Sequence, residues 1–70
     1  MDKKEVNKLS NIMFELTVAY GLTPQKVVEE TEVDYNTVVR IQSENPFVEL
    51  DDFVKVRDYV AQYYDTIVKK

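Results

Sequence analysis

The segment from Leu22 to Ile41, LTPQKVVEETEVDYNTVVRI, constrains the fold more than any other part of the chain. Thr23-Pro24 marks a helix start, because the threonine hydroxyl can cap free N–H groups and proline suits the first helical position. A second start follows at Asp34, whose carboxylate can cap another helix. Residues 31–33 leave room for only a three- or four-residue turn between the two. The segment therefore predicts two short helices joined by a tight turn.

The apolar positions of this segment follow helical spacing and show which side of each helix faces inward. The predicted inward residues are Val27, Val28 and Thr31 on the first helix, and Val38 and Ile41 on the second. Val33 is the apolar residue of the turn, and its side chain is predicted to fill the inner side of the turn. Two short helices at this spacing suit a helix-turn-helix, in which the second helix is offered to a groove or to a partner.

Composition places this pair of helices in one small domain. The chain has 70 residues, of which 44% are hydrophobic and 31% charged, so it is neither disordered nor membrane-like. One glycine and two prolines leave little material for hairpins, and the chain reads as all-helical. No apolar run approaches the roughly 20 residues that span a bilayer, and the N-terminus does not resemble a signal peptide. We therefore expect a cytoplasmic protein without a membrane partner.

The chain lacks the residue types that most often carry catalysis or bind metals. It has no cysteine and no histidine, which removes thiolate zinc sites and the commonest metal ligand and general base. Four aspartates of the C-terminal third have no convincing base, nucleophile or phosphate-binding loop beside them: Asp51, Asp52, Asp58 and Asp65. We expect no enzyme activity, no catalytic residue, no metal site and no cofactor.

Two longer helices flank the central pair. Asp2 and Glu5 resemble a capping box, and Gly21 is a stop signal, so the first helix is predicted over residues 3–20. Its inward stripe is Val6, Leu9, Met13, Leu16 and Tyr20, widened by Ile12 and Ala19.

The sequence QSENPF ends the second short helix, and a last helix is predicted over residues 49–68. Its inward stripe is predicted as Leu50, Phe53, Arg57, Val60, Tyr64 and Ile67. The buried cluster that joins the helices is predicted as Leu16, Val33, Val38, Ile41, Leu50 and Phe53.

The stretch from Glu15 to Val60 resembles the phage-repressor-like (Xre and Cro type) helix-turn-helix domain. The resemblance is carried by Gly21-Leu22-Thr23, Val27-Val28, Val33, Thr37-Val38 and Arg40-Ile41, and by the spacing of Leu50, Phe53, Val56 and Val60. It implies an all-α fold, a small four- to five-helix bundle of the lambda-repressor-like type with a long C-terminal helix. It also implies a homodimer that places its recognition helix, about residues 34–44, in the major groove of double-stranded DNA. The chain departs from the family at Glu32, where a glycine is usual.

Carried over by position, the resemblance implies a DNA-binding set of Gln25, Lys26, Asp34, Tyr35, Asn36, Val39, Arg40 and Ser43. The chemistry of the set suits base reading, since Asn36 can pair with adenine and Arg40 with guanine or phosphate. Lys3, Lys4 and Lys8 are either solvating charges or phosphate contacts. The alternative is that Asp34 only caps its helix and the other residues are ordinary surface.

The charge of the chain favours a second function. The net charge is −4, and between residues 24 and 45 two basic residues are outnumbered by five acidic ones. Phosphate contacts dominate the affinity of most DNA-binding proteins, and such a surface opposes them. The alternative function is a helix-turn-helix module that binds a protein partner instead of DNA, for example an antagonist of a regulator.

An apolar surplus predicts a dimer interface. Phe14 and Val18 lie opposite the inward stripe of the first helix, and the last helix ends in Tyr63, Tyr64 and Ile67. A domain of this size has too little interior to bury both sets. Either the C-terminal turn folds back over Phe14 and Val18 within one chain, or the two surfaces meet across a two-fold axis in a homodimer.

Overall fold

A computed structural model describes residues 1–69, and within that range it contains helices and no strand. The four helices and the short π-helical turn that extends the last one are α1 (Lys3–Tyr20), α2 (Pro24–Thr31), α3 (Tyr35–Gln42), α4 (Leu50–Tyr63) and η1 (Tyr64–Val68). Together α4 and η1 form a last helix of 19 residues. The predicted all-α class and the long C-terminal helix are therefore confirmed.

The ends of α1 lie where the sequence predicts them. The backbone N–H of Lys4 donates to Asp2 Oδ1 at 3.0 Å, so Asp2 caps the helix start. Gly21 ends the helix in the left-handed region, with φ at 74°, and its N–H donates to the carbonyl of Thr17 at 3.1 Å. The predicted span of residues 3–20 is confirmed.

The central pair also begins at the predicted caps. Thr23 Oγ1 accepts from the backbone N–H of Lys26 at 3.2 Å, and Asp34 Oδ2 accepts from the N–H of Asn36 at 3.0 Å. Glu32 forms the turn between α2 and α3 and has a φ of 61°, in the left-handed region. Side-chain caps therefore define both helix starts, and one left-handed residue reverses the chain between them.

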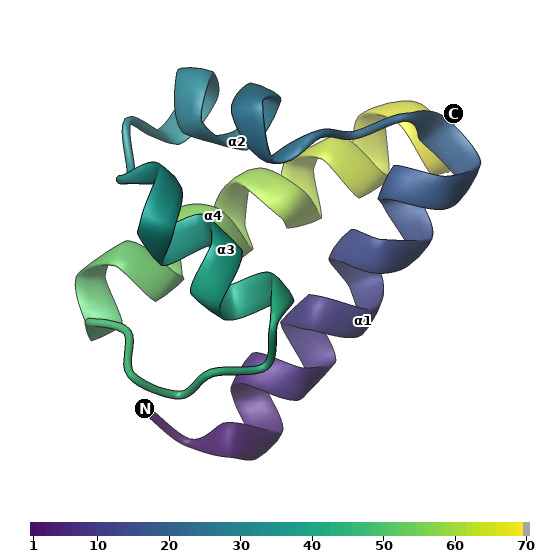
Figure 1. Ribbon diagram of the computed structural model, residues 1–70. Coiled ribbons are helices and arrows are strands. Elements are labelled where there is room, and N and C mark those ends of the chain that lie inside the picture. Colours follow the sequence, from purple (N-terminus) through teal and green to yellow (C-terminus); the bar gives the residue numbers. More distant parts are fainter. Residues whose placement is uncertain (70) are drawn as a thin grey trace.

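The core is a single cluster to which every helix contributes. It consists of Val6, Leu9, Met13, Leu16, Leu22, Val27, Val33, Val38, Ile41, Phe53, Val56 and Val60. In Figure 1, α1 runs along one edge of the molecule, α2 crosses its top, and α3 lies in front of α4. The Ser10 hydroxyl donates to the carbonyl of Gln42 at 2.8 Å and joins α1 to the end of α3. Leu16, Val33, Val38, Ile41 and Phe53 are confirmed as core residues.

The predicted inward face of α4 and its extension is confirmed at Phe53 and Val60 and is wrong at Leu50, Arg57 and Ile67. Leu50 is 62% exposed, and Arg57 is exposed and pairs with its neighbour Asp58, while Phe53, Val56 and Val60 are buried. Leu50 is the first residue of α4 and lies on the Arg57 side of the helix, about a sixth of a turn from Phe53. The buried line steps by three and four residues from Phe53 and leaves Leu50 outside the core.

The stripe of α1 is also narrower than predicted. Ile12 is 41% exposed and Tyr20 44%, and Ala19 is exposed. Ile12 lines a groove of about 370 Å³ between α1 and the last helix. Within residues 1–69 no helix has the length and hydropathy needed to cross a membrane.

Candidate functional site

The outer face of α3 carries most of the residues predicted to contact DNA. Burial of Val38 and Ile41 fixes the rotation of this helix and turns the opposite side to solvent. Tyr35, Asn36, Arg40 and Ser43 are exposed, and Val39 is half-buried among them. These five residues therefore form one continuous surface, which we call the α3 face. It offers an amide, a guanidinium, two hydroxyls and an apolar group.

The other three predicted residues have different surroundings. Asp34 is the N-cap of α3, and one of its carboxylate oxygens accepts the N–H of Asn36. Gln25 and Lys26 are exposed in the first turn of α2. Lys26 Nζ pairs with Glu30 Oε1 at 3.0 Å, and the hydrogen bond and charge of Glu30 raise the pKa of Lys26. Lys26 also lines a groove between α2 and α4, so it does not extend the α3 face.

A hollow beside Arg40 connects the α3 face to the N-terminus. Its volume is about 470 Å³, and it is lined by Met1, Thr37, Arg40, Pro46, Phe47, Val48, Glu49 and Asp52. Met1 thus shares this hollow with Thr37 and Arg40, and in Figure 1 the N-terminus lies beside the loop that follows α3. Lys3 and Lys4 are exposed on the first turn of α1, immediately after Met1.

The same hollow contains features that sequence reasoning missed. Phe47 is 81% exposed at its rim, and two carboxylates, Glu49 and Asp52, lie on the side formed by the start of α4. Among residues 1–69 no ion pair involves Arg40. A phenylalanine that follows a proline gives no sign in the sequence of which way its ring turns. Its exposure follows from the path of the 43–49 loop.

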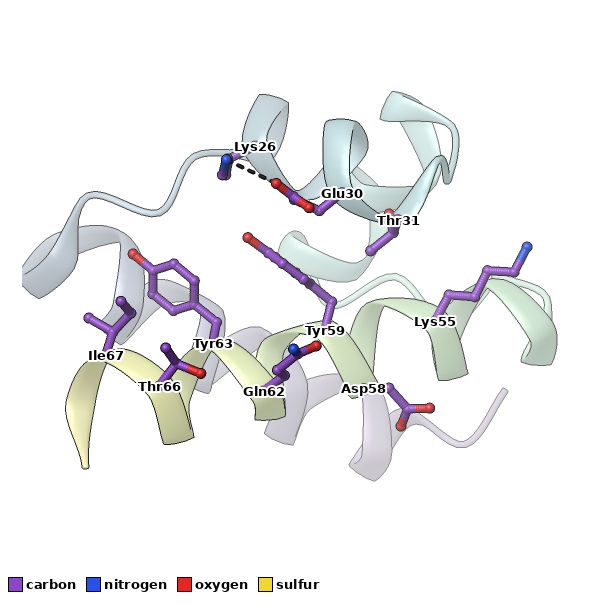
Figure 2. Close-up of a pocket in the computed structure, with 10 residues that line it drawn as sticks. All are labelled: Lys26, Glu30, Thr31, Lys55, Asp58, Tyr59, Gln62, Tyr63, Thr66 and Ile67. Atoms are coloured by element: carbon purple, nitrogen blue, oxygen red, sulfur yellow. Dashed lines mark ion pairs between the residues drawn. The ribbon is translucent and has the colours of Figure 1, made fainter. Parts of the chain in front are cut away.

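A second concave surface lies between α2 and the last helix (Figure 2). This open groove of about 590 Å³ is lined by Lys26, Glu30, Thr31, Lys55, Asp58, Tyr59, Gln62, Tyr63, Thr66 and Ile67. The rings of Tyr59 and Tyr63 rise from α4 toward α2, with their centroids 6.1 Å apart. Burial, and then the negative charge of Glu30, raise the pKa of Tyr59. The groove is amphipathic, with a charged α2 rim and an aromatic floor.

The residues predicted to form a dimer interface do not share one surface. Tyr63 and Tyr64 are half-buried against the core, and the Tyr63 hydroxyl lies 3.5 Å from the carbonyl of Tyr20. Ile67 is 44% exposed and lines the α2–α4 groove. Phe14 and Val18 are each 70% exposed on α1. The C-terminal turn, as far as Lys69, therefore does not fold back over Phe14 and Val18.

Near the end of the described chain, a lysine contacts both a carboxylate and an aromatic ring. Lys69 Nζ lies 3.7 Å from Asp65 Oδ1 and 5.9 Å from the centroid of the Tyr64 ring. Lys70 lies outside the described residues. Across residues 1–69 no three acidic side chains gather closely enough to hold a metal ion.

The chain matches no protein-family model, no curated protein and no solved structure. Its function therefore has to be inferred from its own residues and their geometry.

Proposed function

We propose that this protein is a small DNA-binding transcription regulator of the phage-repressor-like helix-turn-helix type, which reads DNA with α3. The observation that carries the proposal is the α2–turn–α3 unit, in which both helices are capped and α3 is anchored on its inner side by Val38 and Ile41. Its outer face is exposed at Asn36, Arg40 and Ser43, with Val39 half-buried among them. A short helix presented in this way fits the major groove.

The chemistry of the α3 face supports the proposal. Asn36 carries the amide that pairs with adenine in a bidentate manner, and Arg40 carries the guanidinium that pairs with guanine. The two lie four residues apart, about one turn, on the same side of the helix. Tyr35 and Ser43 add hydroxyls that can donate to phosphate oxygens at either end.

The surroundings of the hollow beside Arg40 supply further support. Met1 lines the hollow together with Arg40, and Lys3 and Lys4 are exposed two and three residues later, at the start of α1. On a bound duplex these lysines would contact the phosphate backbone flanking the bases that α3 reads. Such contacts offset part of the repulsion from the acidic motif.

The test is a fluorescence-anisotropy titration of the full chain against a pool of random-sequence duplexes, followed by selection of the bound sequences. We expect a preferred sequence at about 50 mM salt. Arg40→Ala and Asn36→Ala should each weaken binding to the selected site by roughly 1–3 kcal/mol. Gln62→Ala, in the α2–α4 groove, is the matched control and should bind as the parent does. Absence of binding to every duplex at this salt concentration would refute the proposal.

A second candidate function is favoured by the exposed side chain of Phe47. Phe47 is 81% exposed at a hollow whose rim also carries Arg40, Glu49 and Asp52. An exposed aromatic ring surrounded by charges of both signs is typical of a protein-binding surface. On this alternative the chain is a helix-turn-helix module that binds another protein, such as a DNA-binding regulator that it inhibits.

One pair of variants distinguishes the two functions. Phe47→Ser should leave specific DNA binding within about twofold if α3 reads bases, since the side chain lies beyond the α3 face. If the protein instead inhibits a regulator, Phe47→Ser should abolish that inhibition while Asn36→Ala should have little effect. The readout is transcription from a reporter in cells that express each variant.

A further inference from the structure

The solvent side of α1 carries a seam with coiled-coil spacing. Asn7, Asn11, Phe14 and Val18 follow one another at intervals of four, three and four residues. This is the spacing at which one helix packs along another. Phe14 and Val18 are each 70% exposed, Asn11 is exposed beside them, and Asn7 is half-buried at the N-terminal end, with its Oδ1 covered. We call these four residues the α1 seam.

One positive and one negative side chain lie beside the seam, at different heights along α1. Lys8 and Glu15 flank it on one side, one near each end, and both are exposed. Among residues 1–69 neither forms an ion pair within the chain. The other side carries Ser10 and Thr17, which line a small uncharged hollow with Phe14 and Gln42. Between residues 7 and 18 the seam therefore has a positive and a negative charge on one side, toward opposite ends, and no charge on the other.

We propose that α1 pairs with α1 of a second copy of this chain in antiparallel orientation, around a two-fold axis between residues 12 and 13. This pairing sets Phe14 beside Asn11 of the second copy, and Val18 opposite Asn7. The two Phe14 rings are neighbours across the axis. Lys8 faces Glu15 of the second copy, and the symmetry repeats this pair, so two intermolecular ion pairs flank the apolar contact.

The charge pattern selects this orientation over the parallel one. In a parallel, in-register pairing Lys4 would meet its own copy on the seam, and Lys3 would face Lys8 across it. The antiparallel pairing instead places Lys4 near Gly21 of the second copy, where the carbonyl end of α1 favours a positive charge. Opposite charges and helix dipoles thus both favour the antiparallel arrangement.

The contact is short, and we expect a reversible dimer. Two apolar residues and two asparagines from each copy form a seam of about three turns, well below the size of an obligate interface. The asparagines weaken the contact and fix its register. The proposal does not depend on DNA binding, because α1 pairs through a surface that contains none of the residues of the α3 face.

The first test measures the oligomeric state of the chain in solution. Sedimentation equilibrium of the full chain should show a monomer–dimer equilibrium with substantial dimer at tens of micromolar. Phe14→Glu should raise the dissociation constant at least about thirtyfold, since two carboxylates would meet at the axis. Leu50→Glu is the matched control, an exposed apolar residue elsewhere, and should leave the constant unchanged. Circular dichroism checks that each variant is folded. A monomer throughout, or an unaltered dimer of Phe14→Glu, would overturn the proposal.

Disulfide trapping tests the orientation, because the chain has no cysteine of its own. In the antiparallel pairing Asn7→Cys and Val18→Cys lie opposite each other, so a mixture of the two variants should form a mixed disulfide. Val18→Cys alone should not cross-link, since its two copies are about 16 Å apart along the helix axis, too far for a disulfide. Rapid cross-linking of Val18→Cys alone would indicate the parallel pairing and overturn the proposal.

A charge exchange tests the ion pairs directly. Lys8→Glu or Glu15→Lys alone places like charges opposite each other twice and should weaken the dimer about five- to tenfold. The double variant Lys8→Glu with Glu15→Lys restores opposite charges and should recover the parent constant. Failure of the double variant to recover would contradict the assignment of these two residues.

Discussion

Glu32 is the residue at which the backbone of the central pair is most constrained. Its φ of 61° lies in the left-handed region, and its N–H donates to the carbonyl of Val28 at 2.8 Å to close α2. A side chain in this region costs on the order of 1 kcal/mol, because Cβ approaches the backbone carbonyl. The turn between α2 and α3 therefore forms here at some cost in stability.

Glu32→Gly should raise the free energy of unfolding by about 0.5–1 kcal/mol, because glycine adopts this conformation without strain. The measurement is urea denaturation followed by circular dichroism. Glu29→Gly is the matched control, since it removes the same charge from the exposed interior of α2 and should destabilise by about 1 kcal/mol. Equal effects of both substitutions would show that charge, and not backbone strain, dominates at residue 32.

Tyr59 makes the stability of the folded state depend on pH in the alkaline range. Burial favours the neutral phenol and raises the pKa of Tyr59 above its ordinary value of 10.0. The folded state therefore holds this proton more tightly than the unfolded state does. Stability is complete below pH 10 and is lost as the pH rises through the higher pKa of the folded state. The raised pKa of Lys26, whose ordinary value is 10.5, has the same sign.

Tyr59→Phe should accordingly reduce the loss of stability above about pH 10. Unfolding free energies of parent and variant, measured by urea denaturation from about pH 8 to pH 11, should diverge only at the alkaline end. Tyr35→Phe, on the exposed α3 face, is the control and should follow the parent. Parallel curves for Tyr59→Phe and the parent would contradict the role of burial at Tyr59.

At the scale of elements, the rotation of α4 decides which residues stabilise the domain. Phe53 is 2% exposed and packs with Val56 and Val60, whereas Leu50, three residues earlier, is 62% exposed. The two side chains have similar hydrophobicity, so composition does not distinguish them. Only their positions around the helix axis differ.

Phe53→Ala should lower the free energy of unfolding by roughly 2–5 kcal/mol, because it removes a buried ring and leaves a cavity. Leu50→Ala is the control on the same helix and should change it by no more than about 0.5 kcal/mol. Chemical denaturation of both variants measures the difference. A large loss for Leu50→Ala would place α4 in a different rotation from the one described.

At the scale of the whole molecule, the proposed DNA binding has to overcome a net charge of −4. Lys3 and Lys4 are exposed at the start of α1, shortly after Met1, which lines the hollow beside Arg40, and they are the proposed source of local positive charge. Local charge of this kind acts within a Debye length, about 10 Å at 0.1 M salt. Binding is therefore expected to be strongest at low salt and to rest on few phosphate contacts.

Lys3→Gln and Lys4→Gln should each weaken binding to all duplexes about equally. Each should also reduce the slope of log affinity against log salt by about 0.9, one phosphate contact on B-DNA. Lys55→Gln, in the α2–α4 groove, is the control and should change neither quantity. Anisotropy titrations at several salt concentrations provide the measurement. A sequence-dependent loss from Lys3→Gln would contradict its assignment to the backbone.

The positions of the helices could be predicted from the sequence because local groups determine them. Asp2, Thr23 and Asp34 each accept a backbone N–H of the following turn, and Gly21 ends α1 in the left-handed region. These interactions span no more than a few residues, so they leave a signature in the sequence. The inner side of α3 was predictable for the same reason, since Val38 and Ile41 lie three residues apart and share one face of the helix.

The tertiary structure alone decided how α4 is rotated, where Phe47 points and how the predicted dimer residues separate. The last helix has apolar residues on several sides, and its own sequence does not determine which side faces the core. Packing against α1, α2 and α3 selects Phe53, Val56 and Val60, and it turns Tyr63 and Tyr64 inward while Phe14 and Val18 stay exposed. Helix boundaries are set by groups a few residues apart, whereas buried faces are set by contacts between distant segments. For this reason the sequence by itself determined the elements of this protein, and only the tertiary structure decided its surfaces.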